Sequence, residues 1–284
     1  MRRLLISILV LLLLLSQGVM GQSKFAHQEL GLDIGGTNYL GDLNNQSMFG
    51  KVHLAYGAHF RYKFNDRWAV LVNGALGKLE GGNPDVIPSR NLYFKSDIWE
   101  ASFRVEFNFL PFGMSGRQAC WCPFLFGGLG LFHFNPMAQY TDPATGITDW
   151  VELQPLGTEG QGLAQYPDRE LYGRLQAMLP FGLGVKYRPS KYLVLAVEYG
   201  YRKTWTDYID DVSTTYVEPW LLSSEAAALA DPAPATGAKA DSHHAVGLKR
   251  GDDSLNDWYA YMNVSVNVSM EYLLHWMLKK RCEH

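Results

Sequence analysis

The chain has 284 residues and a formal net charge of −3, from 25 Lys and Arg against 28 Asp and Glu. This balance lacks the basic surplus with which nucleic-acid-binding proteins contact phosphates, so we expect no nucleic-acid partner. The 13% aromatic content favours β-strands over helices.

The first 21 residues have the pattern of a secretory signal peptide. Arg2 and Arg3 precede an apolar run at residues 4–15. Val19 and Gly21 are residues that a signal peptidase accepts at the −3 and −1 positions of its cleavage site. An apolar run of about 12 residues is too short to cross a bilayer as a helix. We expect cleavage after Gly21 and a mature chain of residues 22–284. This chain is then either a soluble β-sandwich or an outer-membrane barrel.

Long alternating runs of apolar and polar residues distinguish these two folds. Between Ala101 and Phe109, for example, every odd residue is apolar and every even residue is polar. Such runs exceed the usual 5–6 residues of a globular strand and match the roughly 9–11 residues of a tilted transmembrane strand. We expect eight strands, at residues 28–37, 52–64, 68–79, 101–109, 123–134, 179–188, 193–202 and 258–270. The run 123–134 alternates poorly and is assigned from its composition and the need for an even strand count.

The connections between these strands alternate in length. Long loops are expected at about 38–50, 80–95, 135–177 and 205–255, and shorter turns at 65–67, 110–122 and 189–191. Long loops on one face and short turns on the other are typical of outer-membrane proteins. The sequence therefore predicts an all-β, eight-stranded antiparallel up-and-down transmembrane barrel in the cell outer membrane. The long loops face outward, and the short turns and both termini face the periplasm.

Several charged residues occupy the polar positions of the strands. Eight strands enclose a lumen that side chains fill, so we expect these charges to point inward and to form ion pairs. They are Arg104, Glu106, Lys186, Glu198 and Arg202. A plugged lumen is the favoured interpretation, and a proton or solute path is the alternative.

Acidic residues flank the last long loop, but we predict no metal or cofactor there. Asp207, Asp210 and Asp211 precede the loop, and Asp252, Asp253 and Asp257 follow it. Clustered carboxylates can bind Ca²⁺, yet their spacing is not that of an EF-hand, and solvated acids are the simpler interpretation. The pair His243-His244 adjoins a low-complexity stretch, residues 226–241, which we expect to be flexible.

Enzymatic activity is not expected. The chain has no Gly-x-Ser-x-Gly motif, and although small barrel enzymes place a Ser/His pair on outward strand positions, no serine stands at a matching height near the candidate bases His59 and His133. An outer-membrane enzyme is kept as a third hypothesis for the function.

The cysteines and the tail suggest contacts on the periplasmic side. Cys120, Cys122 and Cys282 are all expected there, in an oxidising compartment. Cys282 could pair with Cys120 or Cys122 and leave one thiol for a partner, or all three could be unpaired. The tail from about residue 271 is apolar and then basic. It is either a short helix at the inner leaflet or a handle for a periplasmic partner.

Two separated motifs stand out in the mature chain: GGTNYLGDLN, from Gly35 to Asn44, and EYGYRKTWTDYIDDVSTTY, from Glu198 to Tyr216. Together with the ending Lys279–Cys282, they resemble the PorG family, small outer-membrane barrels of the type IX secretion system of the Bacteroidetes. The resemblance covers essentially the whole mature chain. It implies a non-enzymatic role, anchoring or positioning the periplasmic ring of the PorK lipoprotein and PorN for export of cargo with C-terminal sorting domains.

These motifs also supply a predicted rim at the outer mouth of the barrel. Its residues are Tyr39, Asp42, Trp205, Asp207, Tyr208, Asp210 and Asp211. We expect the aromatics at the membrane interface and the acids beyond it, where charge is easily tolerated and turns start easily. The acids should form a structured rim that is tied to the loop at residues 38–44 on the same face. The long loops also support an alternative function, a surface adhesin or ligand-binding barrel.

Overall fold

The computed structural model describes residues 27–44, 51–82, 91–112, 119–232 and 245–281. The expected signal peptide, His243, His244 and Cys282 lie outside these ranges.

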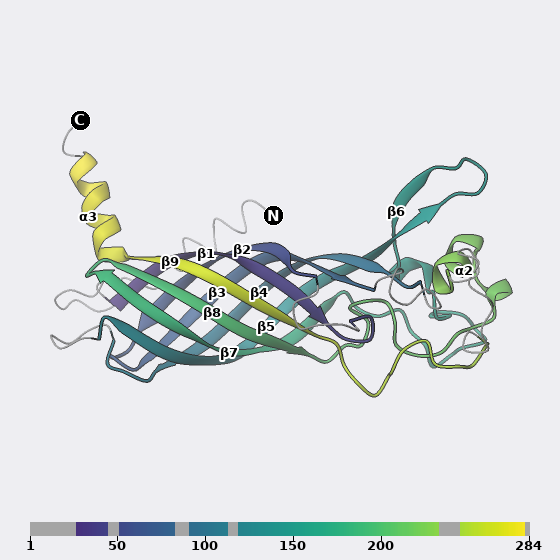
Figure 1. Ribbon diagram of the computed structural model, residues 1–284, viewed down its shortest axis with the longest axis horizontal. Helices are drawn as coiled ribbons and strands as arrows, with labels where there is room; N and C mark the ends of the chain where they lie inside the picture. Colours follow the sequence, from purple (N-terminus) through teal and green to yellow (C-terminus); the bar gives the residue numbers. More distant parts are fainter. Residues whose placement is uncertain (1–26, 45–50, 83–90, 113–118, 233–244, 282–284) are drawn as a thin grey trace.

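The strands close into a single barrel, as predicted (Figure 1). Each strand pairs antiparallel with its neighbours; β1 pairs with both β2 and β9, and β4 pairs with β5 to complete the ring. The eight barrel strands are β1 (Gln28–Leu40), β2 (His53–Lys63), β3 (Trp68–Gly81), β4 (Phe94–Asn108), β5 (Trp121–Thr141), β7 (Leu175–Ser190), β8 (Leu193–Thr204) and β9 (Trp258–Ser269).

Several strands are longer than the alternation predicted. β4 begins at Phe94 and β5 continues to Thr141, where it pairs with an additional strand, β6 (Thr148–Glu152). The extra residues lie toward the long loops. There the outer wall carries charged residues, such as the Lys78–Asp97 pair, so the apolar pattern stops while the backbone ladder continues.

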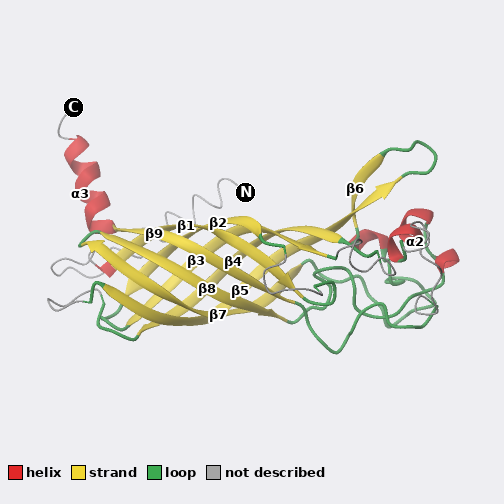
Figure 2. Ribbon diagram, in the orientation of Figure 1, coloured by secondary structure: helices red, strands yellow, loops and turns green. Residues whose placement is uncertain are grey.

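The two ends of the barrel differ (Figure 2). The short-turn end carries the turns, the start of β1 and the helix α3 (Met270–Arg281) that follows β9. The long-loop end carries the β5–β6 hairpin, the 3₁₀ helices η2 (Gln154–Leu156) and η3 (Pro219–Leu221), and the helix α2 (Ser224–Ala230). We call the folded loops at this end the cap.

Helix α2 corrects the expectation of flexibility for residues 226–230; residues 233–241 of the predicted low-complexity stretch lie outside the described ranges. The Ser223 hydroxyl accepts a hydrogen bond from the Ala226 backbone N–H, which caps the helix. Ala226, Leu229 and Ala230 are buried. A capped helix with an apolar face is therefore packed into the cap.

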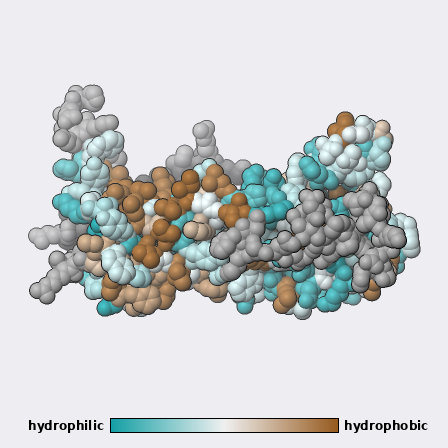
Figure 3. Space-filling view, in the orientation of Figure 1, coloured by the Kyte–Doolittle hydropathy of each residue, from teal (hydrophilic) through white to brown (hydrophobic). Residues whose placement is uncertain are grey.

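The outer wall is apolar and the lumen polar, the reverse of a water-soluble barrel. Figure 3 shows an apolar band over the half of the barrel nearer the short-turn end. On β3 the band runs from Trp68 to Leu76 and ends before Lys78, comparable to the roughly 9–11 residues of a membrane-crossing strand. Exposed apolar residues of the wall include Leu32, Tyr56, Leu76, Phe103, Leu129, Leu183, Val197 and Val264.

Within the described ranges, none of the helices has the length and apolar character needed to cross a membrane.

Candidate functional site

The lumen near the short-turn end is filled by ion pairs centred on Glu106. Its carboxylate accepts hydrogen bonds from Arg61 Nε and Nη2 at 3.0 and 3.2 Å, and from Lys186 Nζ at 2.5 Å. Arg61 also donates to Glu29 at 2.9 Å, and Lys63 contacts the same carboxylate. All five side chains are buried, so each charge is neutralised within the lumen rather than by water.

Two further ion pairs lie closer to the long-loop end. Arg104 donates to Glu198 at 2.9 Å. Arg202 forms a two-pronged pair with Glu100, with N–O distances of 3.1 and 2.9 Å, and the Tyr259 hydroxyl also donates to Glu100 at 2.7 Å. The structure thus places Arg104, Glu106, Lys186, Glu198 and Arg202 in the lumen, all buried. The partners Arg61 and Glu100 were not singled out from the sequence, although the same alternation could have indicated them.

Apolar clusters close the lumen beyond the ion pairs. At the short-turn end Phe112, Cys122 and Val194 pack together. Toward the long-loop end Phe94, Phe132, Phe134 and Tyr259 belong to a larger core that extends into the cap. The lumen is therefore filled by side chains along its length, which favours a plug over a path.

The two histidines considered as catalytic bases, His59 and His133, contact polar lumen residues and an aromatic ring of the wall, respectively. His59 was considered for an outward position but points into the lumen, where it contacts Asp33 at 3.1 Å and Asn267 at 2.6 Å. His59 is two residues from Arg61 in β2, so both side chains point to the same side of the strand, into the lumen. His133 lies on the outer wall and stacks on Trp99 at 5.7 Å between ring centroids.

The predicted rim residues come together at the barrel mouth, but their acids are not in water. The Tyr39 hydroxyl lies 2.6 Å from Asp210 Oδ2 and 2.6 Å from Asp257 Oδ1. The backbone N–H groups of Val212 and Ile209 donate to the other oxygens of these two carboxyls. Asp207, Asp210 and Asp211 are buried as well. The expectation of solvated acids was wrong, because the loop after β8 folds back over the mouth and buries Ile209 and Val212.

Hydrogen-bond valence at Tyr39 requires a proton on the acid pair. A tyrosine hydroxyl donates a single proton, so it can donate to only one of Asp210 and Asp257. The second contact is a hydrogen bond only when the other carboxyl is protonated and donates to Tyr39. The geometry therefore describes two carboxyls bridged by the Tyr39 hydroxyl, with at least one of the two protonated. We call this proton the shared proton of the acid pair.

Burial shifts the titration of these acids in the same direction. It raises the pKa of Asp210 to about 8 and, with the adjacent Asp210 charge, raises the pKa of Asp257 well above its ordinary value. Burial also raises the pKa of Asp207 to about 8. Burial also raises the pKa of Asp211, to about 6. The rise is smaller than for Asp210 because nearby Arg250 favours the charged form.

The remaining rim residues are divided between solvent and contacts within the cap. Trp205 is half exposed. Tyr208 stacks on Tyr172 with a centroid distance of 4.7 Å. Asp42 accepts a hydrogen bond from the Asp252 backbone N–H at 2.5 Å, which joins the loop after β1 to the segment before β9.

A buried ion pair holds the cap together and was not predicted. Arg250 Nη1 donates to Glu159 at 3.0 Å, and Glu159 also accepts from the backbone N–H groups of Ser213 and Thr214 at 2.9 Å each. No sequence pattern marks this pair, because its members lie in irregular loops far apart in the chain.

No metal site accompanies these acids in the part of the chain that the structure describes: nowhere in it are three or more His, Cys, Asp or Glu side chains grouped to hold an ion.

The short-turn end holds the described cysteines. Cys120 is exposed, whereas Cys122 is buried with its Sγ 3.4 Å from the Leu110 backbone. Cys122 is thus part of the lumen plug, and Cys120 is the more accessible thiol. The pairing of either one with Cys282 stays a prediction.

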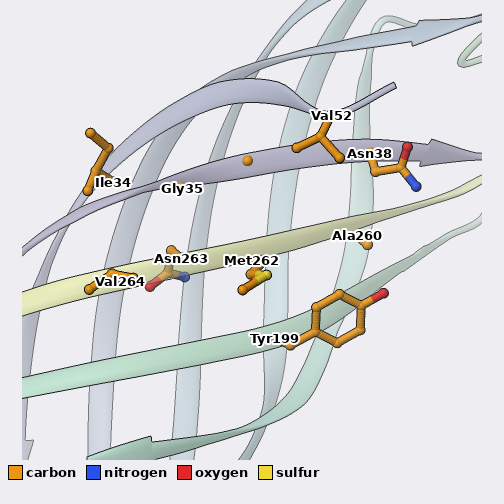
Figure 4. A pocket seen from close by; sticks show the side chains of 10 residues that line it. Ile34, Gly35, Asn38, Val52, Tyr199, Ala260, Met262, Asn263 and Val264 are labelled. Carbon is orange, nitrogen blue, oxygen red and sulfur yellow. The ribbon is translucent and has the colours of Figure 1, made fainter. Parts of the chain in front are cut away.

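An apolar groove crosses the outer wall where β1, β9 and β8 adjoin (Figure 4). Its volume is about 240 Å³, and it opens where Gly36 and Ala260 replace the bulky residues found elsewhere on the wall. Met262, Val52 and Tyr199 form its sides. This lining suits a hydrocarbon chain and carries no catalytic group.

Comparison with protein-family models decides the family. Residues 2–149 match the family described as Domain of unknown function (DUF6089), which is more than half of the chain. The chain belongs to the DUF6089 family. No curated protein matches it.

Solved structures similar to this DUF6089 protein are small outer-membrane proteins. Neisserial surface protein A is 11% identical, with 86% of this chain and 97% of that chain covered and a TM-score of 0.42. Ail of Yersinia pestis, solved with a heparin analogue, is 12% identical, with 85% and 98% covered and a TM-score of 0.38. OprG of Pseudomonas aeruginosa is 11% identical, with 85% and 96% covered and a TM-score of 0.36. Similarity at this level carries no information about a shared ligand or partner.

Proposed function

We propose that this protein is an outer-membrane barrel that anchors other components and does not conduct solutes. The observation that carries the proposal is the combination of an apolar outer band with a lumen filled by paired charges. The band requires a hydrocarbon environment outside the barrel. The buried pairs around Glu106 and Glu100 leave the interior no role as an aqueous channel.

The finer proposal is that the anchored components belong to the type IX secretion machinery. Support comes from the resemblance of the Gly35–Asn44 and Glu198–Tyr216 motifs to the PorG family. In this proposal the short-turn end faces the periplasm and meets the PorK/PorN ring, and exposed Cys120 lies on that side. The role is non-enzymatic.

Crosslinking followed by co-purification from outer membranes tests this proposal. The ring proteins are expected to co-purify with the tagged chain, and deletion of the gene is expected to stop export of cargo with C-terminal sorting domains while leaving the envelope intact. A matched pair of variants locates the contact: changes in the turn 65–67 should weaken co-purification, whereas Ile147→Ser in the cap hairpin should not. Normal export in the deletion strain contradicts the proposal.

One observation favours a second candidate function, ligand binding by the cap. The β5–β6 hairpin projects from the long-loop end (Figure 1) and exposes Ile147 at its tip, while Trp150 lies 5.2 Å below the Lys95 ammonium. Such a projecting surface suits an adhesin. Loss of surface binding with normal secretion in an Ile147→Ser variant would support this candidate over the first.

A further inference from the structure

The helix α3 leaves the barrel without an intervening loop. β9 ends at Ser269 and α3 begins at Met270. Figure 1 shows the helix running across the long axis of the barrel and away from its wall, instead of continuing along the strands or crossing the mouth. A helix in this direction projects over the area surrounding the barrel at the short-turn end.

The helix starts at the edge of the apolar band. Val266 lies on the outer wall of β9, a few residues before α3. The ring of Tyr272, in the first turn of the helix, lies 5.1 Å from the ring of Tyr192 in the β7–β8 turn. Trp121 and Tyr187 are exposed on the outer wall at the same end. Because aromatic residues mark the interfaces of membrane barrels, α3 begins at the level of the lipid headgroups.

The sequence of α3 separates polar from apolar residues. Glu271 and His275 are four residues apart and so share one stripe of the helix. The residues between Glu271 and Lys279 other than His275 are all apolar or aromatic: Tyr272, Leu273, Leu274, Trp276, Met277 and Leu278. The helix then closes with the basic residues Lys279, Lys280 and Arg281.

The described side chains of α3 leave large apolar surfaces uncovered by the barrel. Tyr272 and Trp276, one turn apart, are 44% and 49% exposed. Leu273 and Leu274 are half-buried. A helix with aromatic residues on one side, a polar stripe and a basic end has the composition of helices that lie on anionic membranes.

We propose that α3 lies in the plane of the bilayer surface at the short-turn end, with Tyr272 and Trp276 inserted among the lipids. This inference rests on the membrane location in the proposed function. The partner of this helix surface is the phospholipid leaflet that surrounds the barrel. The helix continues the apolar band outward, and its sequence ends in basic residues, which match anionic headgroups. The stripe of Glu271 and His275 then faces water and stays open to periplasmic components.

Photocrosslinking of adjacent positions tests the orientation of the helix. The full-length protein carries a photoreactive amino acid at position 276 or at position 275 and is folded into vesicles of zwitterionic lipid containing an anionic phospholipid. Position 276 should crosslink to lipid, and position 275, on the polar stripe, should not. Equal lipid labelling at both positions, or none at position 276, overturns the proposal.

Tryptic cleavage after Lys279 supplies a second readout, followed by intact mass spectrometry. Removing the inserted indole weakens the hold of the membrane on the helix, so Trp276→Gln should speed cleavage by roughly tenfold or more. His275→Gln is the matched control and should change the rate little. Equal rates for both variants overturn the proposal.

The same samples separate this inference from the proposed function. Heat-modifiable migration on gels shows whether the barrel has folded into the vesicles, and ring proteins are absent from them. If the barrel is folded but the photoreactive group at position 276 reacts only with water, the role of α3 is disproved. The proposed anchor is then untouched. A position 276 that crosslinks in cells only to protein has the same consequence. A barrel that does not insert disproves the membrane location instead.

Discussion

The lumen and the cap both bury carboxylates, but they stabilise them differently. In the lumen Glu29, Glu100, Glu106 and Glu198 each contact an Arg or Lys side chain. In the cap, Arg250 contacts Asp211 and Glu159, while Asp210 and Asp257 are held by Tyr39, by backbone N–H groups and by a shared proton.

The difference follows from the two kinds of backbone. Paired strands place every second side chain in the lumen at a defined height, so a long cation can be set opposite each acid. A loop has no such repeat, but it has N–H groups that are not used in a ladder and can point at a carboxylate. The lumen therefore depends on charge pairing, whereas the cap combines the ion pairs of Arg250 with protonation of the Asp210–Asp257 pair.

Among single substitutions, removing the central acid of the lumen should have the largest effect. Glu106→Ala leaves Arg61 and Lys186 without their shared carboxylate, and breaking a buried pair in this way costs about 3–5 kcal/mol. Urea unfolding of the vesicle-inserted protein, followed by tryptophan fluorescence, measures the loss. A change below about 1 kcal/mol, the range of exposed pairs, would show that the lumen is hydrated enough to screen these charges.

Raising the pH should weaken the cap and leave the barrel as an internal reference. Asp210 loses its proton near its ordinary pKa of 3.8 in the unfolded chain, but burial holds its pKa at about 8 in the cap. A pKa raised by folding gives stability that is complete below the ordinary value and is lost as the pH approaches the folded value. Cap stability should therefore fall between about pH 4 and pH 8, by about 1.4 kcal/mol per pH unit for one such group.

Amide exchange at the cap measures this loss directly. The N–H groups of Ile209 and Val212 donate to the acid pair, so their protection factors should decrease with pH while those of β9 stay constant. Asp257→Asn removes one titrating group and retains an amide that can hydrogen-bond to Tyr39, so it should flatten the dependence. An unchanged pH profile in this variant would falsify the shared-proton account.

A smaller effect is expected from crowding the acid pair without changing its charge. A Cβ at Gly41 would lie 1.8 Å from Asp257 Oδ1 and 2.1 Å from the Tyr39 hydroxyl. Gly41→Ala must push the two groups apart, at a cost of about 1–3 kcal/mol. Gly127→Ala in β5 is the control, since its Cβ meets nothing within 4 Å. Equal protection of Ile209 in the two variants would contradict the proximity of Gly41 to the pair.

The smallest effect should come from an ion pair exposed to water. Arg174 and Glu152 are 2.8 Å apart, with side chains 33% and 44% exposed. Glu152→Ala should cost less than about 1 kcal/mol, because water and salt screen such pairs. The same urea titration tests it, and a loss approaching that of Glu106→Ala would remove the contrast between buried and exposed pairs.

The barrel could be predicted from the sequence because strand periodicity is local. Alternation alone indicates that Arg104 and Glu106 share one side of β4. It does not indicate that Arg61 of β2 reaches Glu106, because that contact depends on the register of two intervening pairings. The Tyr39–Asp257 contact joins residues at opposite ends of the chain. The burial of Asp210 could not be predicted either, since irregular loops have no periodicity that reveals which side faces a core.

The length of β5 has a consequence for whatever meets the cap. The strand has 21 residues, about twice the 9–11 that cross a membrane. Beyond His133, where its pairing with β7 ends, it pairs with β4 as far as Met137 and then with β6. The cap is thus mounted on a stiff hydrogen-bonded collar that stands clear of the bilayer. Because a rigid mount has little orientational freedom to lose on association, a molecule arriving from outside meets a surface already presented in one direction.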